Sequence, residues 1–124
     1  MTKKILVVDD NDDAREMMAK LLELESFSVI SANDGLTAIN LTESECPDLI
    51  ITDINMPGMD GIEMIKMLRE QPELDHVPIM ALTAYGGSVA AEAIKAGADH
   101  AATKPVEFNK LIDGVRRLLE KFDS

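Results

Sequence analysis

The sequence has no tryptophan, one tyrosine, three phenylalanines and a single cysteine among its 124 residues. One cysteine, Cys46, cannot form an internal disulfide, and the absence of a signal peptide or a long apolar run predicts a cytoplasmic chain. With two histidines far from that cysteine, a zinc site of the usual kind is excluded. Aliphatic side chains and the eight methionines must therefore fill the interior.

Positive charge is also scarce, with 12 lysines and arginines against 23 acidic residues and a net charge of -11. Nucleic acid and anionic membrane surfaces would be repelled, so neither is expected as a direct partner. Cations and basic or mixed-charge proteins are compatible with this charge. The length is that of one domain, and we expect residues 1–124 to form it.

Apolar runs and helical periodicity alternate along the whole chain. The expected strands are 5–8, 27–31, 49–52, 77–82 and 100–102. The first and third are apolar without alternation, which is typical of a parallel sheet covered on both faces, whereas the second alternates in part and suits an edge. The expected helices follow Asn11, run over 36–44, follow Gly61, run over 89–95 and begin at Phe108.

Two helices show a clear apolar stripe. In the first, the spacing i, i+3, i+4, i+7, i+8 predicts that the face toward the sheet consists of Ala14, Met17, Met18, Leu21 and Leu22. In the last, the corresponding face consists of Phe108, Leu111, Ile112, Val115, Leu118, Leu119 and Phe122.

Five strands alternating with five helices predict an α/β fold with a parallel sheet and helices on both faces. Right-handed crossovers leave few windings, of which the flavodoxin-like strand order 2-1-3-4-5 is the natural one. Ligands of such sheets bind beyond the carboxyl ends of the strands, at the switch point between strands one and three.

Polar side chains stand at four of these strand ends. Asp9 and Asp10 follow the first strand and Asp53 ends the third, so three carboxylates would crowd one rim and repel each other. A hard cation resolves that conflict, and Mg²⁺ prefers oxygen ligands of this kind. Thr83 and Lys104 add a hydroxyl and an ammonium, which together fit phosphoryl transfer onto Asp53 as an acyl phosphate.

Each of these residues also has an ordinary structural interpretation. Asp53 can simply turn the chain, and Asp9 and Asp10 can cap the following helix. Thr83 can be a plain strand residue, and Lys104 can belong to a strand end, where the next residue, a proline, is tolerated. The phosphoryl-transfer interpretation is favoured because all these types occur together.

The chain resembles the receiver domain of two-component response regulators, of the chemotaxis response regulator type. The resemblance covers the whole chain, in order, and rests on Asp9-Asp10, Asp53 with Met56-Pro57 and Asp60-Gly61, Thr83-Ala84 and Lys104-Pro105.

This resemblance implies that Asp53 accepts a phosphoryl group from a sensor histidine kinase or a histidine phosphotransfer protein and thereby switches binding of a downstream effector. It implies Mg²⁺ held by Asp10, Asp53 and the backbone carbonyl of Asn55, with Asp9 acting through water. It also implies a cis peptide bond before Pro105 and a signalling domain, not an enzyme, that catalyses only its own phosphorylation and dephosphorylation. A monomer or a weak phosphorylation-dependent dimer is expected.

One position departs from the family pattern. The family usually carries tyrosine or phenylalanine three residues before the lysine, where this chain has Ala101. We therefore expect backbone and loop shifts to carry the signal, with Tyr85 as a candidate substitute for the aromatic ring. The usual output surface of the family, the fourth helix, fifth strand and fifth helix, would here include Lys95, His100 and the basic end of the last helix.

Three rival functions rank lower. A docking module without chemistry has no reason to keep the full set of site residues. A metal-dependent phosphohydrolase would need a cap and a second acid two residues after Asp53, and an FMN-binding protein would need a phosphate loop and stacking aromatics. The initial methionine and the end of the last helix favour a stand-alone receiver over a domain cut from a larger regulator.

Overall fold

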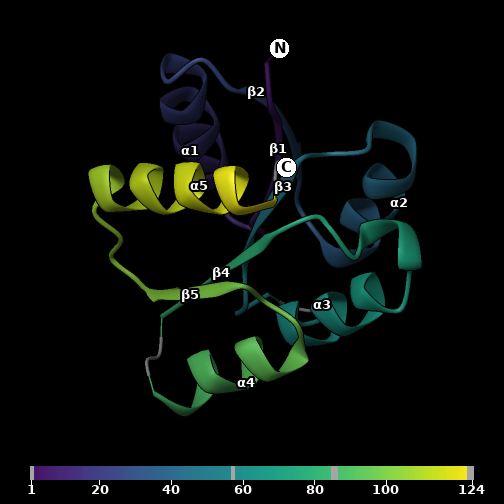
Figure 1. The fold of residues 1–124 in the computed structure, drawn as a ribbon. Coiled ribbons are helices and arrows are strands. Elements are labelled where there is room, and N and C mark those ends of the chain that lie inside the picture. The colour runs from purple at the N-terminus through teal and green to yellow at the C-terminus, as the bar shows by residue number, and fades with distance from the viewer. Residues whose placement is uncertain (1, 57, 85–86, 123–124) are drawn as a thin grey trace.

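The computed structural model describes residues 2–56, 58–84 and 87–122, which build one parallel sheet with helices on both faces. The strand order is β2-β1-β3-β4-β5, as predicted, with β2 and β5 at the edges (Figure 1). The strands are β1 (Lys4–Val8), β2 (Ser28–Ala32), β3 (Leu49–Asp53), β4 (Ile79–Thr83) and β5 (His100–Thr103).

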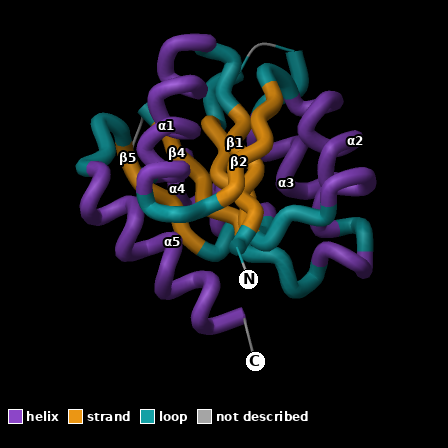
Figure 2. Tube along the Cα trace, turned by 90° about the horizontal axis from the view of Figure 1, so that it is seen from above, coloured by secondary structure: helices purple, strands orange, loops and turns teal. Residues whose placement is uncertain are grey.

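The helices divide between the two faces of the sheet, as Figure 2 shows from above. Those described are α1 (Asp12–Leu24), α2 (Gly35–Glu45), α3 (Gly61–Arg69), α4 (Ser88–Ala96) and α5 (Phe108–Phe122), with a short 3-10 helix η1 (Pro72–Leu74). Helices α1 and α5 pack on one face, and α2, α3 and α4 pack on the other. Within the described part of the chain, no helix has the length and apolar character needed to span a membrane.

Strand β1 shows why its apolar run has no alternation. Ile5 and Val7 point into the core under α1 and α5, whereas Leu6 and Val8 point into the core under α2, α3 and α4. Successive strand residues face opposite sides of a sheet, so a sheet covered on both faces requires apolar residues at every position. The predicted two-sided sheet is thereby confirmed.

The predicted stripe of α1 is wrong at two positions. Met17 is 61% exposed and Ala14 is also exposed, while Leu22 is fully buried. Met18 and Leu21 of the predicted stripe are partly buried, and Arg15 is partly buried beside them, with its guanidinium donating a hydrogen bond of 2.9 Å to the carbonyl of Asp9. The observed face is turned toward Arg15 relative to the predicted one and has the same helical period.

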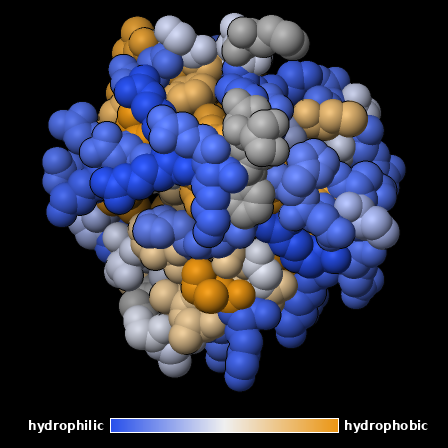
Figure 3. Space-filling view, viewed as in Figure 1, coloured by the Kyte–Doolittle hydropathy of each residue, from blue (hydrophilic) through white to orange (hydrophobic). Residues whose placement is uncertain are grey.

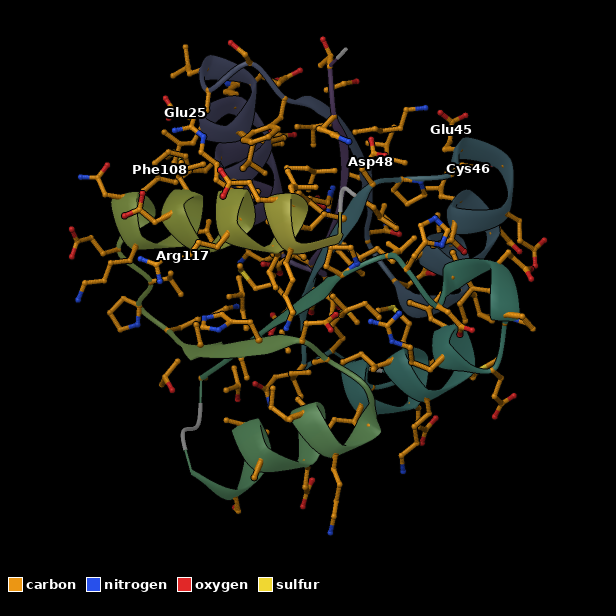
Figure 4. The ribbon with its side chains drawn as sticks, in the orientation of Figure 1. Glu25, Glu45, Cys46, Asp48, Phe108 and Arg117 are labelled. Carbon is orange, nitrogen blue, oxygen red and sulfur yellow. The ribbon has the colours of Figure 1, made fainter. Side chains whose placement is uncertain are left out.

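Within the described part of α5 the predicted face is confirmed, with Leu111, Ile112 and Val115 buried against the sheet and Phe108, Leu118 and Leu119 packed beside them. The predicted member Phe122 has a side chain outside the described part. Its other side is joined to the end of α1, where Arg116 lies 3.2 Å from the Glu25 carboxylate and 6.0 Å from the centre of the Phe27 ring (Figure 4 labels Glu25). These contacts hold α5 beside α1 over one face of the sheet.

Lys4 holds together the end of the sheet at which the strands begin. Its backbone N–H donates to the Asp48 carboxylate at 2.8 Å, and its ammonium lies 3.2 Å from the Glu45 carboxylate. Figure 4 shows Glu45, exposed Cys46 and Asp48 together near the end of α2. These contacts fix the start of β1 against the start of β3.

Candidate functional site

The carboxyl ends of β1 and β3 form the centre of the site. The two strands are parallel neighbours in register, with Val8 opposite Thr52, so the residues that follow, Asp9 and Asp53, lie at the same rim. The chain then continues into α1 on one face and α3 on the other. This is the switch point at which α/β sheets bind ligands.

Three carboxylates meet there, as the strand order predicted. Asp9, Asp10 and Asp53 each offer an oxygen, and these oxygens lie within 4.8 Å of one another. The Asp53 side chain is only 7% exposed and that of Asp9 is 13% exposed, whereas Asp10 is open to solvent. The cluster therefore combines confined negative charge with one accessible side.

Burial raises the pKa of the Asp9 carboxyl above its ordinary value. The charges of Asp53 and Asp10 also raise this pKa, while the N–H of Asn11 and the ammonium of Lys104 act against the rise. The net direction shows that the local partners only partly offset the cost of keeping this carboxylate charged. Additional positive charge at the cluster would relieve that cost.

Among the described residues, Lys104 places a positive charge nearest to the three carboxylates. Its Nζ lies 2.9 Å from Oδ2 of Asp53 and 3.8 Å from Oδ2 of Asp9. The backbone N–H of Lys104 donates to the carbonyl of Thr83 at 2.7 Å, and the following bond to Pro105 is cis, as the resemblance implied. The end of β5 thus holds the ammonium over the carboxylates.

Asp53 also turns the chain, as its ordinary structural interpretation expected, whereas the expected capping of α1 by Asp9 and Asp10 is wrong, because Asn11 is the N-cap. Oδ1 of Asp53 accepts the N–H of Asn55 at 3.0 Å, and Oδ1 of Asp9 accepts the N–H of Asn11 at 3.0 Å. Asn11 itself caps α1 by accepting the N–H of Ala14. One carboxylate oxygen of each aspartate orders its loop.

Gly61 explains part of the motif that follows Asp53. A Cβ atom at this position would lie 2.6 Å from both the carbonyl oxygen of Asp53 and the Cα of Ile54. The first turn of α3 therefore passes directly against the end of β3, which only glycine permits. Asp60 precedes it and caps α3 by accepting the N–H of Glu63 at 2.8 Å.

Thr83 is fully buried at the end of β4, beside Asn55. The side-chain oxygen Oδ1 of Asn55 lies 3.4 Å from the Thr83 hydroxyl and 3.2 Å from the backbone nitrogen of Ala84. The contacts of the Asn55 side chain with Thr83 and Ala84 were not predicted from the sequence. No local pattern signals it, because Asn55 and Ala84 are 29 residues apart.

Ala101 lies in β5, opposite Ala81 of β4, and packs partly buried against the apolar cluster under α2, α3 and α4. Its side chain is a methyl group, so this position has no aromatic ring that could change orientation. Tyr85 lies outside the described residues, so the hypothesis about its ring stays a prediction. Pro57 of the motif also lies outside the described residues.

The geometry fits a hard divalent cation, since the oxygens are carboxylates, close together and open on one side. A doubly wound parallel sheet with such a cluster and a lysine at its switch point defines a class of α/β protein that binds charged groups at the carboxyl edge.

Comparison with known proteins identifies the family within this class. The model of the response regulator receiver domain family matches residues 5–116. The chain belongs to this family. It is a receiver domain of two-component systems, and such domains act in signalling between histidine kinases and downstream effectors.

Three relatives illustrate the match. The polar-differentiation response regulator DivK of Brucella ovis is 32% identical over 120 residues, covering 96% of this chain and 98% of that one. The chemotaxis response regulator CheY4 of Vibrio cholerae is 31% identical with a TM-score of 0.89, over 95% and 99% of the two chains. TrrA of Thermotoga maritima, solved with Mg²⁺-BeF, is 33% identical with a TM-score of 0.85, over 94% and 99%.

Proposed function

We propose that the chain is a phosphoryl-accepting switch and that Asp53 is its phosphoacceptor. One observation carries this proposal: a buried Asp53 carboxylate has oxygens of two further carboxylates within 4.8 Å and the Lys104 ammonium 2.9 Å away. A structural aspartate at a strand end needs neither neighbour. Both are useful if negative charge must build up at Asp53 and be neutralised there.

In the proposed reaction, an oxygen of Asp53 attacks the phosphorus of a phosphohistidine. The new P–O bond forms as the P–N bond breaks, and the departing imidazole nitrogen keeps the electron pair while the ring takes up one proton from solvent. Lys104 and the Thr83 hydroxyl stabilise charge on the phosphoryl oxygens. Attack of water on phosphorus later releases phosphate and restores the carboxylate.

The residues present also fit a Mg²⁺ cofactor. Asp10, Asp53 and the backbone carbonyl of Asn55 would hold it, with Asp9 acting through a bound water. When bound, the ion supplies positive charge that offsets the three carboxylates and the phosphoryl oxygens. The solved relative TrrA was crystallised with Mg²⁺ and BeF, which supports this assignment.

The test uses acetyl phosphate as a small phosphoryl donor and intact-mass spectrometry as the readout. The wild-type protein should gain the mass of one phosphoryl group only when Mg²⁺ is present. Asp53→Asn should gain none, while the control Asp75→Asn, an exposed aspartate after η1, should behave as wild type. Absence of the adduct in wild type under all conditions would leave the fold intact and reduce the function to docking without chemistry.

The remaining proposals concern the setting of this switch. We expect residues 1–124 to act as one cytoplasmic response regulatory domain that is not an enzyme with a free substrate, as a monomer or a weak phosphorylation-dependent dimer. The phosphoryl donor would be a sensor histidine kinase or a histidine phosphotransfer protein, and the effector would bind the face formed by α4, β5 and α5. Figure 3 supports an effector site there, because an apolar patch lies over α4, whose Ile94 is 47% exposed.

A further inference from the structure

A cavity of about 430 Å³ lies at the end of the sheet where the strands begin. It is bounded by the end of α2, the segment that leads into β3, the helix η1 and the segment that leads into β4. Its apolar lining includes three buried side chains, Pro47, Leu74 and Val77, and the partly buried Leu119 of α5. Cavities that bind ligands have volumes of roughly 300–1,000 Å³ and are mostly apolar, so this one is large enough to take a partner group.

Acidic side chains stand around this apolar lining. Glu43, Asp48 and Glu73 all line the cavity, against Lys3 as the lining lysine. Asp48 already accepts the backbone N–H of Lys4 at 2.8 Å. Glu43 and Glu73 are exposed, and neither forms an ion pair with any residue in 2–56, 58–84 or 87–122. An apolar floor beside carboxylates of this kind favours an apolar group with a positive charge next to it.

We propose that the cavity docks a basic segment of a partner protein. An apolar side chain of that segment lies against Leu74 and Val77, and a neighbouring lysine or arginine lies beside Glu43 and Glu73. The net charge of -11 also favours a partner of the opposite charge. The proposal goes beyond the proposed function, because the cavity contains no residue of the carboxylate cluster, which lies at the other end of the sheet.

The form of the cavity fits a protein segment. Glu43, Cys46, Glu73 and His76 are exposed, so the cavity opens onto the surface and an approaching chain can reach its floor. Figure 4 shows Cys46 and Asp48, two of the lining residues, near the end of α2. Exposed ion pairs contribute little each, so burial of the apolar side chain supplies most of the affinity and the two glutamates supply the preference for a basic neighbour.

The test measures how fast Cys46 reacts with the thiol reagent DTNB, because Cys46 lines the cavity, is exposed and is the only cysteine in the sequence. The probe is the peptide acetyl-Gly-Lys-Leu-Arg-Gly-amide, which should slow the reaction along a saturating curve. The same peptide with serine in place of leucine should bind about tenfold more weakly, because the apolar burial is lost. The peptide with glutamate in place of both basic residues should give no protection.

Two double variants separate docking in the cavity from general attraction to an acidic protein. Glu43→Gln with Glu73→Gln should weaken binding of the basic leucine peptide about threefold, the effect of two exposed ion pairs. The control, Glu16→Gln with Glu92→Gln, removes the same charge from exposed positions of α1 and α4 and should bind the peptide as wild type does. Each rate is compared with that of the same variant without peptide.

Three results would overturn the proposal: no protection of Cys46 by the basic leucine peptide, equal protection by the leucine and serine peptides, or equal weakening in the two double variants. Asp53→Asn should leave the protection unchanged, because docking uses no group at the phosphoacceptor end of the sheet. The result is therefore independent of whether acetyl phosphate modifies Asp53.

Discussion

Lys104 and Asp53 are 51 residues apart in the chain, yet the lysine Nζ lies 2.9 Å from Oδ2 of the aspartate. The end of β5 and the end of β3 are separated in the sheet by β4, so the long lysine side chain spans the intervening strand. This ion pair places a cation where a metal ion and a phosphoryl group would also compete for the same carboxylate.

Replacing Lys104 with methionine keeps the side-chain stem and removes the charge. Mg²⁺ should bind more tightly, because the ammonium no longer competes for Asp53, while phosphorylation by acetyl phosphate at saturating Mg²⁺ should slow at least about tenfold. Isothermal titration calorimetry and intact-mass time courses measure the two effects. Lys110→Met, at an exposed position of α5, should change neither, and weaker Mg²⁺ binding by Lys104→Met would contradict the competition.

Asp9→Asn should raise the melting temperature of the metal-free protein at neutral pH. Burial raises the pKa of Asp9, so the folded protein holds this proton more tightly than the unfolded chain does, and ionisation costs stability as the pH rises through that pKa. The same substitution should reduce the rise in melting temperature that Mg²⁺ produces. A lower melting temperature without metal would show that the Asp9 carboxylate stabilises the fold.

Gly61→Ala should lower the free energy of unfolding by about 1–3 kcal/mol, because the added Cβ meets the backbone of Asp53 and Ile54 at 2.6 Å. Urea unfolding measures the change. The control is Gly114→Ala in α5, where the Cβ would meet only the flexible end of Met80 at 3.2 Å. For Gly114→Ala, the free energy of unfolding should stay the same or rise by up to about 1 kcal/mol, because alanine has a higher helix propensity than glycine. Equal losses of stability at both glycines would contradict the close approach at Gly61.

Asp34 should make the stability of α2 depend on pH. Its Oδ1 accepts the N–H of Thr37 at 2.7 Å, and this hydrogen bond lowers the pKa of Asp34 below its ordinary value of 3.8. The stabilisation is present above that ordinary value and is lost as the pH falls through the lowered one. Thermal melts should show Asp34→Ala less stable than wild type at neutral pH, with a gap that closes in acid.

Asp34→Asn keeps a capping oxygen without a titrating group. Its stability should remain closer to that of wild type at neutral pH. Unlike wild type, this variant should not lose stability in acid through protonation of residue 34. A gap between wild type and Asp34→Ala that stays constant down to the lowest pH would show that the cap does not depend on the charge.

Local chemistry made several features predictable. The runs 5–8 in β1 and 49–51 in β3 are apolar at every position because both faces of the sheet are covered, and this burial is visible in the sequence. The start of α2 is also set locally, because the Asp34 side chain accepts the N–H of Thr37 three residues away in the same segment.

Contacts between distant segments could not be predicted in the same way. The predicted stripe of α1 was wrong at Ala14 and Met17, and the contact from Arg15 to the carbonyl of Asp9 on the inward side has no periodic signal. The Asn55 side chain was missed because its partners follow another strand.

The sequence by itself determined which residues stand at or just after the strand ends, since the apolar runs are followed there by Asp9, Asp53, Thr83 and Lys104 and hydrophobic burial sets where a strand can continue. Only the tertiary structure decided the distances and partners among them. Strand register and the close passage of α3 at Gly61 depend on packing the whole sheet. That packing joins residues far apart in the chain, and no local pattern encodes it.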